Sequence, residues 1–166
     1  FNKEKAEWFN SEYLRAKSDE EVLELLKKAE GITLENSSDA QLLKIISLMK
    51  ERATFVRDIY TEGIFFFEAP TQYEEKAVKK AWNEAAVEVM SEFSLKLQDS
   101  VFEPLTLKQD IHDFAESKGL GMGKVMMPLR LCLVGELKGP DVPDIMQILG
   151  KEETIARIKN AVNNIQ

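Results

Sequence analysis

The apolar residues of this chain recur at the three- to four-residue spacing of amphipathic helices. Between positions 73 and 97 the spacing is continuous and involves Val78, Trp82, Ala85, Val89, Phe93 and Leu97. Alternating patterns typical of half-buried strands are essentially absent. The pattern predicts an all-α protein with one long helix over residues 73–97, and it places Trp82 on the buried face of that helix.

Signals for helix starts support this prediction. A hydroxyl residue followed three positions later by Glu or Gln can form a capping box, in which each side chain bonds a backbone amide that the helix would otherwise leave unpaired. Four such pairs precede apolar-periodic segments, and we expect a helix to begin at each: Ser18/Glu21, Ser38/Gln41, Thr71/Glu74 and Thr106/Gln109.

Helix breakers divide the chain into two parts. Helices are expected near residues 3–16, 19–30 and 39–60, and the aromatic cluster at positions 65–67 is interpreted as packing at a helix end. Pro70 follows and disfavours a continuing helix. We therefore predict two helical subdomains, residues 1–69 and 70–166.

Prolines and glycines also divide the second part. Pro104 and Thr106 are expected to begin a helix, and the glycines at positions 119, 121 and 123 to loosen the chain after it. Pro128 suits a first helical turn, where its missing N–H costs nothing. The next helix should end around Gly135 and Gly139, followed by helices near 142–149 and 152–163.

Composition and charge narrow the class of protein. The chain has 166 residues, 44% of them hydrophobic, which suffices for one sizeable core or two smaller ones. A net charge of -7 opposes nonspecific coating of a nucleic acid, so any such contact has to be local. The single Cys132 excludes an intrachain disulfide, and no apolar run reaches the roughly 18 residues of a spanning helix. We expect a cytoplasmic protein with no membrane partner, and a piece of a longer chain, because the sequence opens without Met inside a helical pattern.

Catalytic motifs are missing. We find no Gly-rich phosphate loop, no Cys or His pair at metal-ligand spacing and no nucleophile motif, so no catalytic residue, metal or cofactor is expected in this chain. His112 lies between Asp110 and Asp113, but adjacent helical positions point in different directions, which favours a solvated or capping role. Cys132 has apolar neighbours and is expected in the core. A small enzyme built on His112 and Cys132 remains an alternative.

Two segments depart from the acidic average. Residues 119–140 hold three basic residues against one acidic residue, and residues 41–57 hold four against one. Charge alone favours solvated faces. Arg130 is a more specific signal than these basic segments, because it interrupts an apolar run and burying a lone guanidinium is expensive. Such a residue snorkels, forms an ion pair, or contacts something outside the chain.

Two sequence blocks resemble bacterial glutamyl-tRNA synthetases. KAEWFNSEYLR, with its Trp-x-Asn-x-x-Tyr pattern, resembles the start of the family's anticodon-binding region. GMGKVMMPLRLCLVGELKGPDVPDIMQILGKE resembles its carboxy-terminal signature, which is a Pro-Leu-Arg helix, a Gly-Pro loop and a Leu-Gly-Lys-Glu helix start. Element order and total length agree with the family over the whole chain.

The resemblance implies a helical cage of two anticodon-binding subdomains, of the class I aminoacyl-tRNA synthetase type. Its expected partner is the anticodon loop of the tRNA for glutamate, with no DNA partner. The family's Rossmann-like catalytic domain and connecting fold would lie upstream of Phe1. The parent would be a monomeric glutamate–tRNA ligase that uses ATP and magnesium, neither of which is expected to bind this chain.

The resemblance also implies site residues. Arg130 matches the arginine that contacts an unstacked anticodon base, and the following loop contributes close backbone approach, although the family more often has Leu at the position of Val142. Arg52 is the candidate for reading the third anticodon base, with Arg57 as a competitor. The base-reading set is Arg130, Gly139, Pro140, Val142 and Arg52, and the phosphate-contacting set is Lys124, Lys138, Lys44 and Lys50. An all-α module that docks a protein through residues 126–134 remains an alternative.

Overall fold

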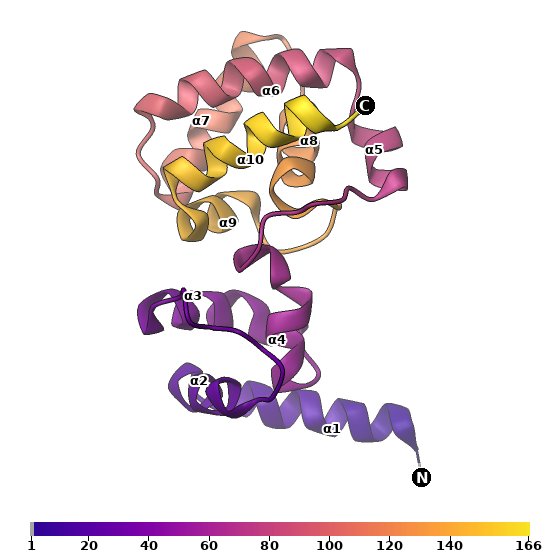
Figure 1. Cartoon of the computed structure of the whole chain (residues 1–166), viewed down its shortest axis with the longest axis vertical. Helices are drawn as coiled ribbons and strands as arrows, with labels where there is room; N and C mark the ends of the chain where they lie inside the picture. Colours follow the sequence, from indigo (N-terminus) through magenta and orange to yellow (C-terminus); the bar gives the residue numbers. More distant parts are fainter. Residues whose placement is uncertain (1) are drawn as a thin grey trace. The chain divides into compact units, whose positions relative to one another are not determined.

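The structure is a computed structural model that describes residues 2–166. These residues form helices joined by turns and loops, and the described part of the chain contains no strand (Figure 1). The all-α prediction is therefore confirmed. Over the same residues, none of the helices is both long enough and apolar enough to cross a membrane.

The chain folds into two compact units, of which the first ends at Glu68 and the second runs from Ala69 to Gln166. Unit 1 contains α1 (Lys3–Ala16), α2 (Asp19–Lys28), α3 (Asp39–Met49), η1 (Lys50–Arg52), α4 (Val56–Glu62) and η2 (Ile64–Phe66). Its core joins one apolar face from each of α2, α3 and α4: Val22, Leu23, Leu26, Leu42, Ile45, Ile46, Met49 and Ile59 are buried.

Unit 2 is built around α8. It contains α5 (Glu75–Ala81), α6 (Glu84–Lys96), η3 (Leu97–Asp99), α7 (Pro104–Ser117), α8 (Gly123–Val134), α9 (Val142–Leu149) and α10 (Lys151–Asn164). Helix α8 contacts each of the other α-helices of this unit, and α10 crosses in front of it in Figure 1. Most of α8 is buried, including every residue from Leu131 to Val134.

Two of the four predicted helix caps form. Ser18 and Glu21 make a complete capping box at α2, and the Ser38 hydroxyl accepts from the backbone amide of Gln41 at α3. The predicted caps at Thr71 and Thr106 are wrong, although a helix does begin at Pro104 as expected. Helix α5 begins after Glu74. Helix α7 begins at Pro104 after Glu103, because proline at the first position has no N–H that would need an acceptor.

The predicted long helix over 73–97 is also wrong, because the chain breaks at Trp82 and Asn83. Both residues have extended backbones, and the Asn83 side chain accepts from the amide of Ala86, which starts α6 afresh. The break shifts the helical phase, so Trp82 is only half-buried and Ala85 is exposed. The buried face of α6 instead carries Ala86, Met90, Phe93 and Ser94.

The predicted helix over 39–60 divides for a similar reason. Helix α3 ends at Met49, and α4 begins only at Val56. Between them, the Asp58 carboxylate accepts from the amides of Thr54 and Phe55, at 3.0 and 2.8 Å. The capping group therefore lies inside the new helix rather than before it.

Pro128 lies inside α8 rather than in its first turn, contrary to the prediction. The helix loses the amide that residue 128 would have donated toward Lys124. Pro128, Val125 and Leu129 are all buried, and this burial offsets the missing hydrogen bond. The last two helices lie close to where the sequence places them, since α9 spans 142–149 and α10 spans 151–164.

Candidate functional site

Arg130 joins the middle of α8 to the loop that follows this helix. Its side chain is half-buried, and Nη1 donates to the carbonyl oxygens of Lys138, at 3.3 Å, and Pro140, at 2.8 Å. These two bonds replace hydrogen bonds to water that the guanidinium loses when it is partly buried, and they hold the loop against the helix. The structure therefore brings together four of the predicted residues: Arg130, Lys138, Gly139 and Pro140.

The loop requires glycine at two positions. Gly135 ends α8 with a φ of 86°, and Gly139 has a φ of 123°, a value that residues with a Cβ rarely adopt. Lys138 is exposed beside Gly139, whereas Pro140 is buried. The loop thus exposes the Lys138 side chain directly before a glycine that is partly exposed.

Val142 differs from the other loop residues because its side chain is only 1% exposed and packs in the core of unit 2. Two acidic residues lie next to it. Partial burial, and then the neighbouring Asp141 carboxylate, raise the pKa of Asp144. This start of α9 is therefore locally acidic, so we expect no phosphate contact there.

Lys124 lies in the first turn of α8, six residues before Arg130, which corresponds to about 9 Å along a helix axis. It is exposed and borders a groove of about 470 Å³. The groove was not predicted, because its walls come from distant parts of the sequence. They are residues from α5 to α6, the glycine-containing turn and α8: Lys80, Ala81, Asn83, Ala85, Ala86, Val89, Leu120, Gly121, Gly123, Lys124, Met127 and Pro128.

The remaining predicted residues belong to unit 1 and differ in their surroundings. Lys44 is exposed on α3, and Arg52 is exposed at the end of η1. Lys50 is engaged inside the unit, because its Nζ donates to the carbonyl of Lys17 at 2.7 Å and to Asp19 at 3.1 Å.

The competing Arg57 lies in the first turn of α4 and packs over a turn of the chain. Its Nη2 lies 3.0 Å from the point where a Cβ would stand at Gly31. Arg52 and Arg57 are thus both exposed, and Arg57 lies against the turn at Gly31.

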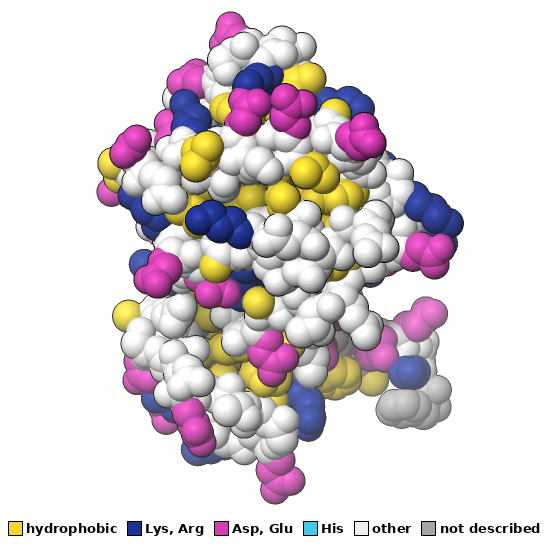
Figure 2. Space-filling model, turned by 45° about the horizontal axis from the view of Figure 1, so that its top comes forward, with side chains coloured by type: hydrophobic (Ala, Val, Ile, Leu, Met, Phe, Trp, Pro, Cys, Tyr) yellow, Lys and Arg dark blue, Asp and Glu magenta, His cyan; other side chains and the backbone are white. Residues whose placement is uncertain are grey.

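Charged side chains are mixed on the molecular surface. On the face drawn in Figure 2, lysines and arginines form separate patches among acidic residues. This distribution agrees with the net charge of -7. A nucleic acid would therefore meet local basic positions rather than a continuous basic surface.

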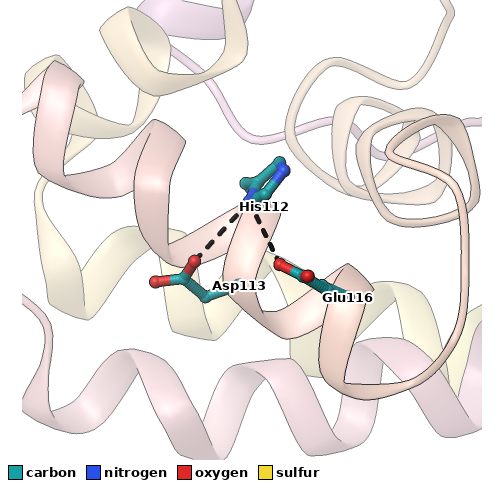
Figure 3. A group of neighbouring side chains, drawn as sticks. All are labelled: His112, Asp113 and Glu116. Atoms are coloured by element: carbon teal, nitrogen blue, oxygen red, sulfur yellow. Dashed lines mark ion pairs between the residues drawn. The ribbon is translucent and has the colours of Figure 1, made fainter.

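His112 forms an exposed group with two acidic residues on α7 (Figure 3). Its Nδ1 lies 3.5 Å from Asp113 and 3.8 Å from Glu116, so His112 and Asp113 do not point apart, contrary to the prediction. A hydrogen bond from Gln109, and then the His112 side chain, lower the pKa of Asp113. The His112 side chain is 54% exposed, which confirms its predicted solvated position. The Asp113 and Glu116 side chains are 53% and 76% exposed, so water reaches all three groups.

Cys132 is fully buried, as predicted, and burial raises the pKa of its thiol. A neutral, inaccessible thiol is a poor nucleophile, which removes the support for a small enzyme built on this residue. The protein-docking alternative has little exposed surface. Of residues 126–134, only Met126, Met127 and Arg130 are partly exposed, and the other six are buried within unit 2.

Arg157 on α10 is a structural residue that the sequence did not reveal. It is 4% exposed, with Nε bonded to Glu153 at 2.9 Å and Nη1 donating to the Leu133 carbonyl at 2.8 Å. Burial lowers its pKa, and the Glu153 carboxylate opposes that shift. The available signals were the Glu153 spacing of four residues and the flanking isoleucines at positions 155 and 158.

Comparisons with known proteins identify related sequences and structures. A family model described as an anticodon binding domain matches residues 8–162. The glutamate–tRNA ligase of Christiangramia forsetii is 41% identical over 170 residues, covering 100% of this chain and 33% of the relative. That of Porphyromonas gingivalis is 38% identical over 167 residues, covering 98% and 32%. The chain thus spans about a third of the length of these relatives.

Two solved structures are similar over the whole chain. A glutamate tRNA ligase from Elizabethkingia meningosepticum, in complex with its amino acid, has a TM-score of 0.93 and 54% identity, covering 100% of this chain and 33% of that one. The glutamate-tRNA synthetase of Elizabethkingia anophelis has a TM-score of 0.90 and 55% identity, covering 99% and 32%.

Proposed function

The chain belongs to the anticodon binding domain family, and on this premise we propose that it recognises the anticodon loop of the tRNA for glutamate as part of a glutamate–tRNA ligase. The family match confirms the resemblance found in the sequence. The function is supported by the names of the similar proteins, which are glutamate–tRNA ligases at 37–41% identity. The match over residues 8–162 is the observation that carries the proposal.

In this proposal the chain performs recognition, and the chemistry belongs to the rest of the longer protein. ATP-dependent attachment of glutamate, with magnesium, would occur in a catalytic part outside these residues. A cytoplasmic location and a monomeric parent accompany the proposal as predictions.

Arg130 is proposed to contact an anticodon base. Single-stranded loops are recognised when unstacked bases lie on side-chain planes and form hydrogen bonds along their edges. A guanidinium suits this task because its planar fork can donate two parallel bonds and can stack on a ring. The bonds from Nη1 to the carbonyls of Lys138 and Pro140 fix the plane of the Arg130 fork relative to the loop. Preorganisation of this kind lowers the entropic cost of binding.

The loop and the lysines are proposed to supply the remaining contacts. Gly139 leaves room for a base to approach the backbone, and Pro140 limits the movement of the loop. Lys124, Lys138 and Lys44 are exposed and suited to phosphates. Lys50 has weaker support because its ammonium group is engaged within unit 1.

The third anticodon base remains assigned to an arginine of unit 1. Arg52 is our first candidate because it is exposed at the end of η1, whereas Arg57 lies against Gly31. Val142 is proposed to act through its backbone, because its side chain is buried.

Replacing Arg130 by Lys tests the base contact. In the longer ligase, Arg130→Lys should weaken binding of the glutamate tRNA by roughly 1–3 kcal/mol, the worth of one good base contact. Binding is measured by titration with the tRNA, and thermal melts verify folding. Arg15→Lys is the matched control, because Arg15 is an exposed arginine paired with Glu12.

A double-mutant cycle separates base contact from loop support, since Arg130 also holds the loop. If Arg130 contacts one base, replacing that base should remove most of the effect of Arg130→Lys. A loosened loop would instead weaken binding by the same factor whichever base is replaced. Additive effects at every anticodon position would contradict the proposed contact.

A further inference from the structure

The first helix of unit 1 carries an exposed aromatic face. Trp8, Phe9 and Tyr13, which we call the α1 aromatic face, are 57%, 56% and 63% exposed. The Trp8 and Phe9 rings meet edge to face, with centroids 5.1 Å apart. Of the 14 residues of α1, Leu14 is the one buried residue. Three large rings side by side in water mark an interaction surface rather than ordinary surface scatter.

Polar contacts join helix α1 to η1 and to the segment that follows η1. The Asn10 side chain donates to the carbonyl of Thr54, and Arg15 donates to the carbonyl of Glu51 at 3.3 Å. Arg15 also lies 3.8 Å from the Glu51 carboxylate. Such exposed pairs contribute little stability. A 14-residue helix is marginal alone, and α1 buries only Leu14, which is less apolar burial than stabilises most protein helices.

We infer that the α1 aromatic face docks on the polypeptide that precedes this helix in the longer glutamate–tRNA ligase. The inference rests on the proposed function. About two thirds of each curated relative lies outside the part that matches this chain. A segment tethered directly to α1 would meet this face at high effective concentration, so a modest apolar contact suffices.

The charges of α1 disfavour RNA as the occupant. The helix carries three basic residues and three acidic residues: Lys3, Lys5, Arg15, Glu4, Glu7 and Glu12. Lysines already lie over two of the rings, with Lys5 5.9 Å from the Phe9 centroid and Lys17 4.4 Å from the Tyr13 centroid. A platform for single-stranded RNA needs a basic groove and open ring faces.

The size of the face disfavours a second copy of the chain. Aromatic side chains bury about 150–250 Å² each. Three partly exposed rings therefore provide less than the roughly 800 Å² that each partner contributes to a stable interface. Contacts between parts of one chain can be smaller and still persist, because the tether removes the cost of association.

Hydrogen exchange without RNA tests the inference. The amides of α1 should exchange at least about tenfold more slowly in the longer ligase than in the chain of residues 1–166, because docking opposes local opening. The double substitution Trp8→Ser and Phe9→Ser should abolish that difference. In the 1–166 chain it should leave exchange in α2 and α3 unchanged, which verifies folding. Leu105→Ser, at an 83% exposed position, is the matched control and should have no effect on α1.

Three outcomes would overturn the inference. The first is equal exchange of α1 in the two proteins. The second is slowing that appears only after glutamate tRNA is added, which would make the face an RNA contact. The third is self-association of the 1–166 chain that the double substitution removes, which would make a second copy the occupant.

The test is independent of the function test. If the ligase fails to bind glutamate tRNA in the Arg130 experiment, the proposed function fails. Protection of α1 is measured without RNA and depends only on contact between parts of the protein, so the two failures are distinguishable.

Discussion

Two arginines attach α8 to its neighbours by donating to backbone carbonyls. Arg130 holds the carbonyls of Lys138 and Pro140, and Arg157 holds that of Leu133. They differ in exposure, because Arg157 is 4% exposed and paired with Glu153, whereas Arg130 is only half-buried. A ligand can therefore approach Arg130, while Arg157 stabilises the fold. A sequence alone cannot separate these roles, since both arginines have apolar neighbours.

Cys132 gives a prediction about pH. Burial raises the pKa of its thiol, so the native protein keeps a proton that the unfolded chain loses above about pH 8.5. The contribution of the protonated Cys132 thiol to stability is complete below the pKa that this thiol has in the unfolded chain. It declines as the pH rises above that pKa. We expect urea unfolding to show falling stability above about pH 8.5, with a shallower fall in Cys132→Ala.

Thiol modification provides the complementary measurement. Iodoacetamide should label Cys132 slowly in the native protein and quickly in denaturant, because the fully buried thiol reacts only after opening. Rapid native labelling would contradict the assignment of Cys132 to an inert core position.

At the scale of elements, apolar spacing predicted which segments are helical but not where helices break. The pattern from Val78 to Leu97 continues through Asn83, although Asn83 begins a new helix. Asparagine is a strong N-cap, but an asparagine can also lie inside a continuing helix. Packing in the folded unit decides which of the two forms. The break at Asp58 is harder still, because the capping carboxylate follows the amides that it binds. Local signals of this kind are visible only once the boundary is known.

The same limit applies to the candidate site. The sequence indicated Arg130 and the Gly139–Pro140 loop, and the structure brings them into contact. The sequence could not reveal that Lys50 binds the Lys17 carbonyl, nor that α5, α6 and α8 form a groove beside Lys124. Both depend on tertiary neighbours distant in the sequence.

The cap at Asn83 is testable by substitution. Asn83→Ala removes the oxygen that accepts from the Ala86 amide at 2.8 Å, and it should cost about 1 kcal/mol of unfolding free energy. Asn163→Ala, at an exposed position near the end of α10, is the control and should change stability little. The measurement is chemical denaturation of both variants. A neutral Asn83→Ala would indicate that α5 and α6 can join into one helix.

Gly135 should tolerate alanine poorly. Its φ of 86° alone costs alanine about 1–2 kcal/mol. A Cβ would also stand 2.9 Å from the carbonyl oxygen of Gln72 and 3.0 Å from Cβ of Pro70. The amide of Glu74 donates to the Gly135 carbonyl at 2.8 Å, so displacement would disturb the start of α5 as well.

Gly123→Ala is the matched control for Gly135→Ala. Apart from its chain neighbours and the backbone of its own helix, a Cβ at Gly123 meets no atom within 4 Å, and the residue begins α8. This change should be neutral or stabilise the protein by up to about 1 kcal/mol. The melting temperature should therefore fall in Gly135→Ala and stay the same or rise in Gly123→Ala. Equal shifts in melting temperature would contradict the contact at Gly135.

At the scale of the whole molecule, the charge sets how RNA can bind. A net charge of -7 repels a polyanion at long range, so affinity has to come from local contacts. Exposed lysines near Arg130 and on α3 are the proposed phosphate partners, and the rest of a longer ligase would share the binding. We therefore expect the 1–166 chain alone to bind the anticodon stem-loop weakly.

The salt dependence of binding tests this account. Each phosphate that a lysine neutralises adds about -0.7 to -0.9 to the slope of log affinity against log salt concentration. Lys124→Ala should reduce the magnitude of the slope by about one such contact and weaken different loop sequences alike, because phosphate contacts carry no sequence information. Lys27→Ala is the control, since Lys27 is paired with Asp39 at 3.0 Å and should leave the slope unchanged. Titrations of the anticodon stem-loop at several salt concentrations give the slopes. An affinity independent of salt, or equal slopes for Lys124→Ala and the wild type, would remove Lys124 from the RNA-binding surface while leaving the contact proposed for Arg130 to its own test.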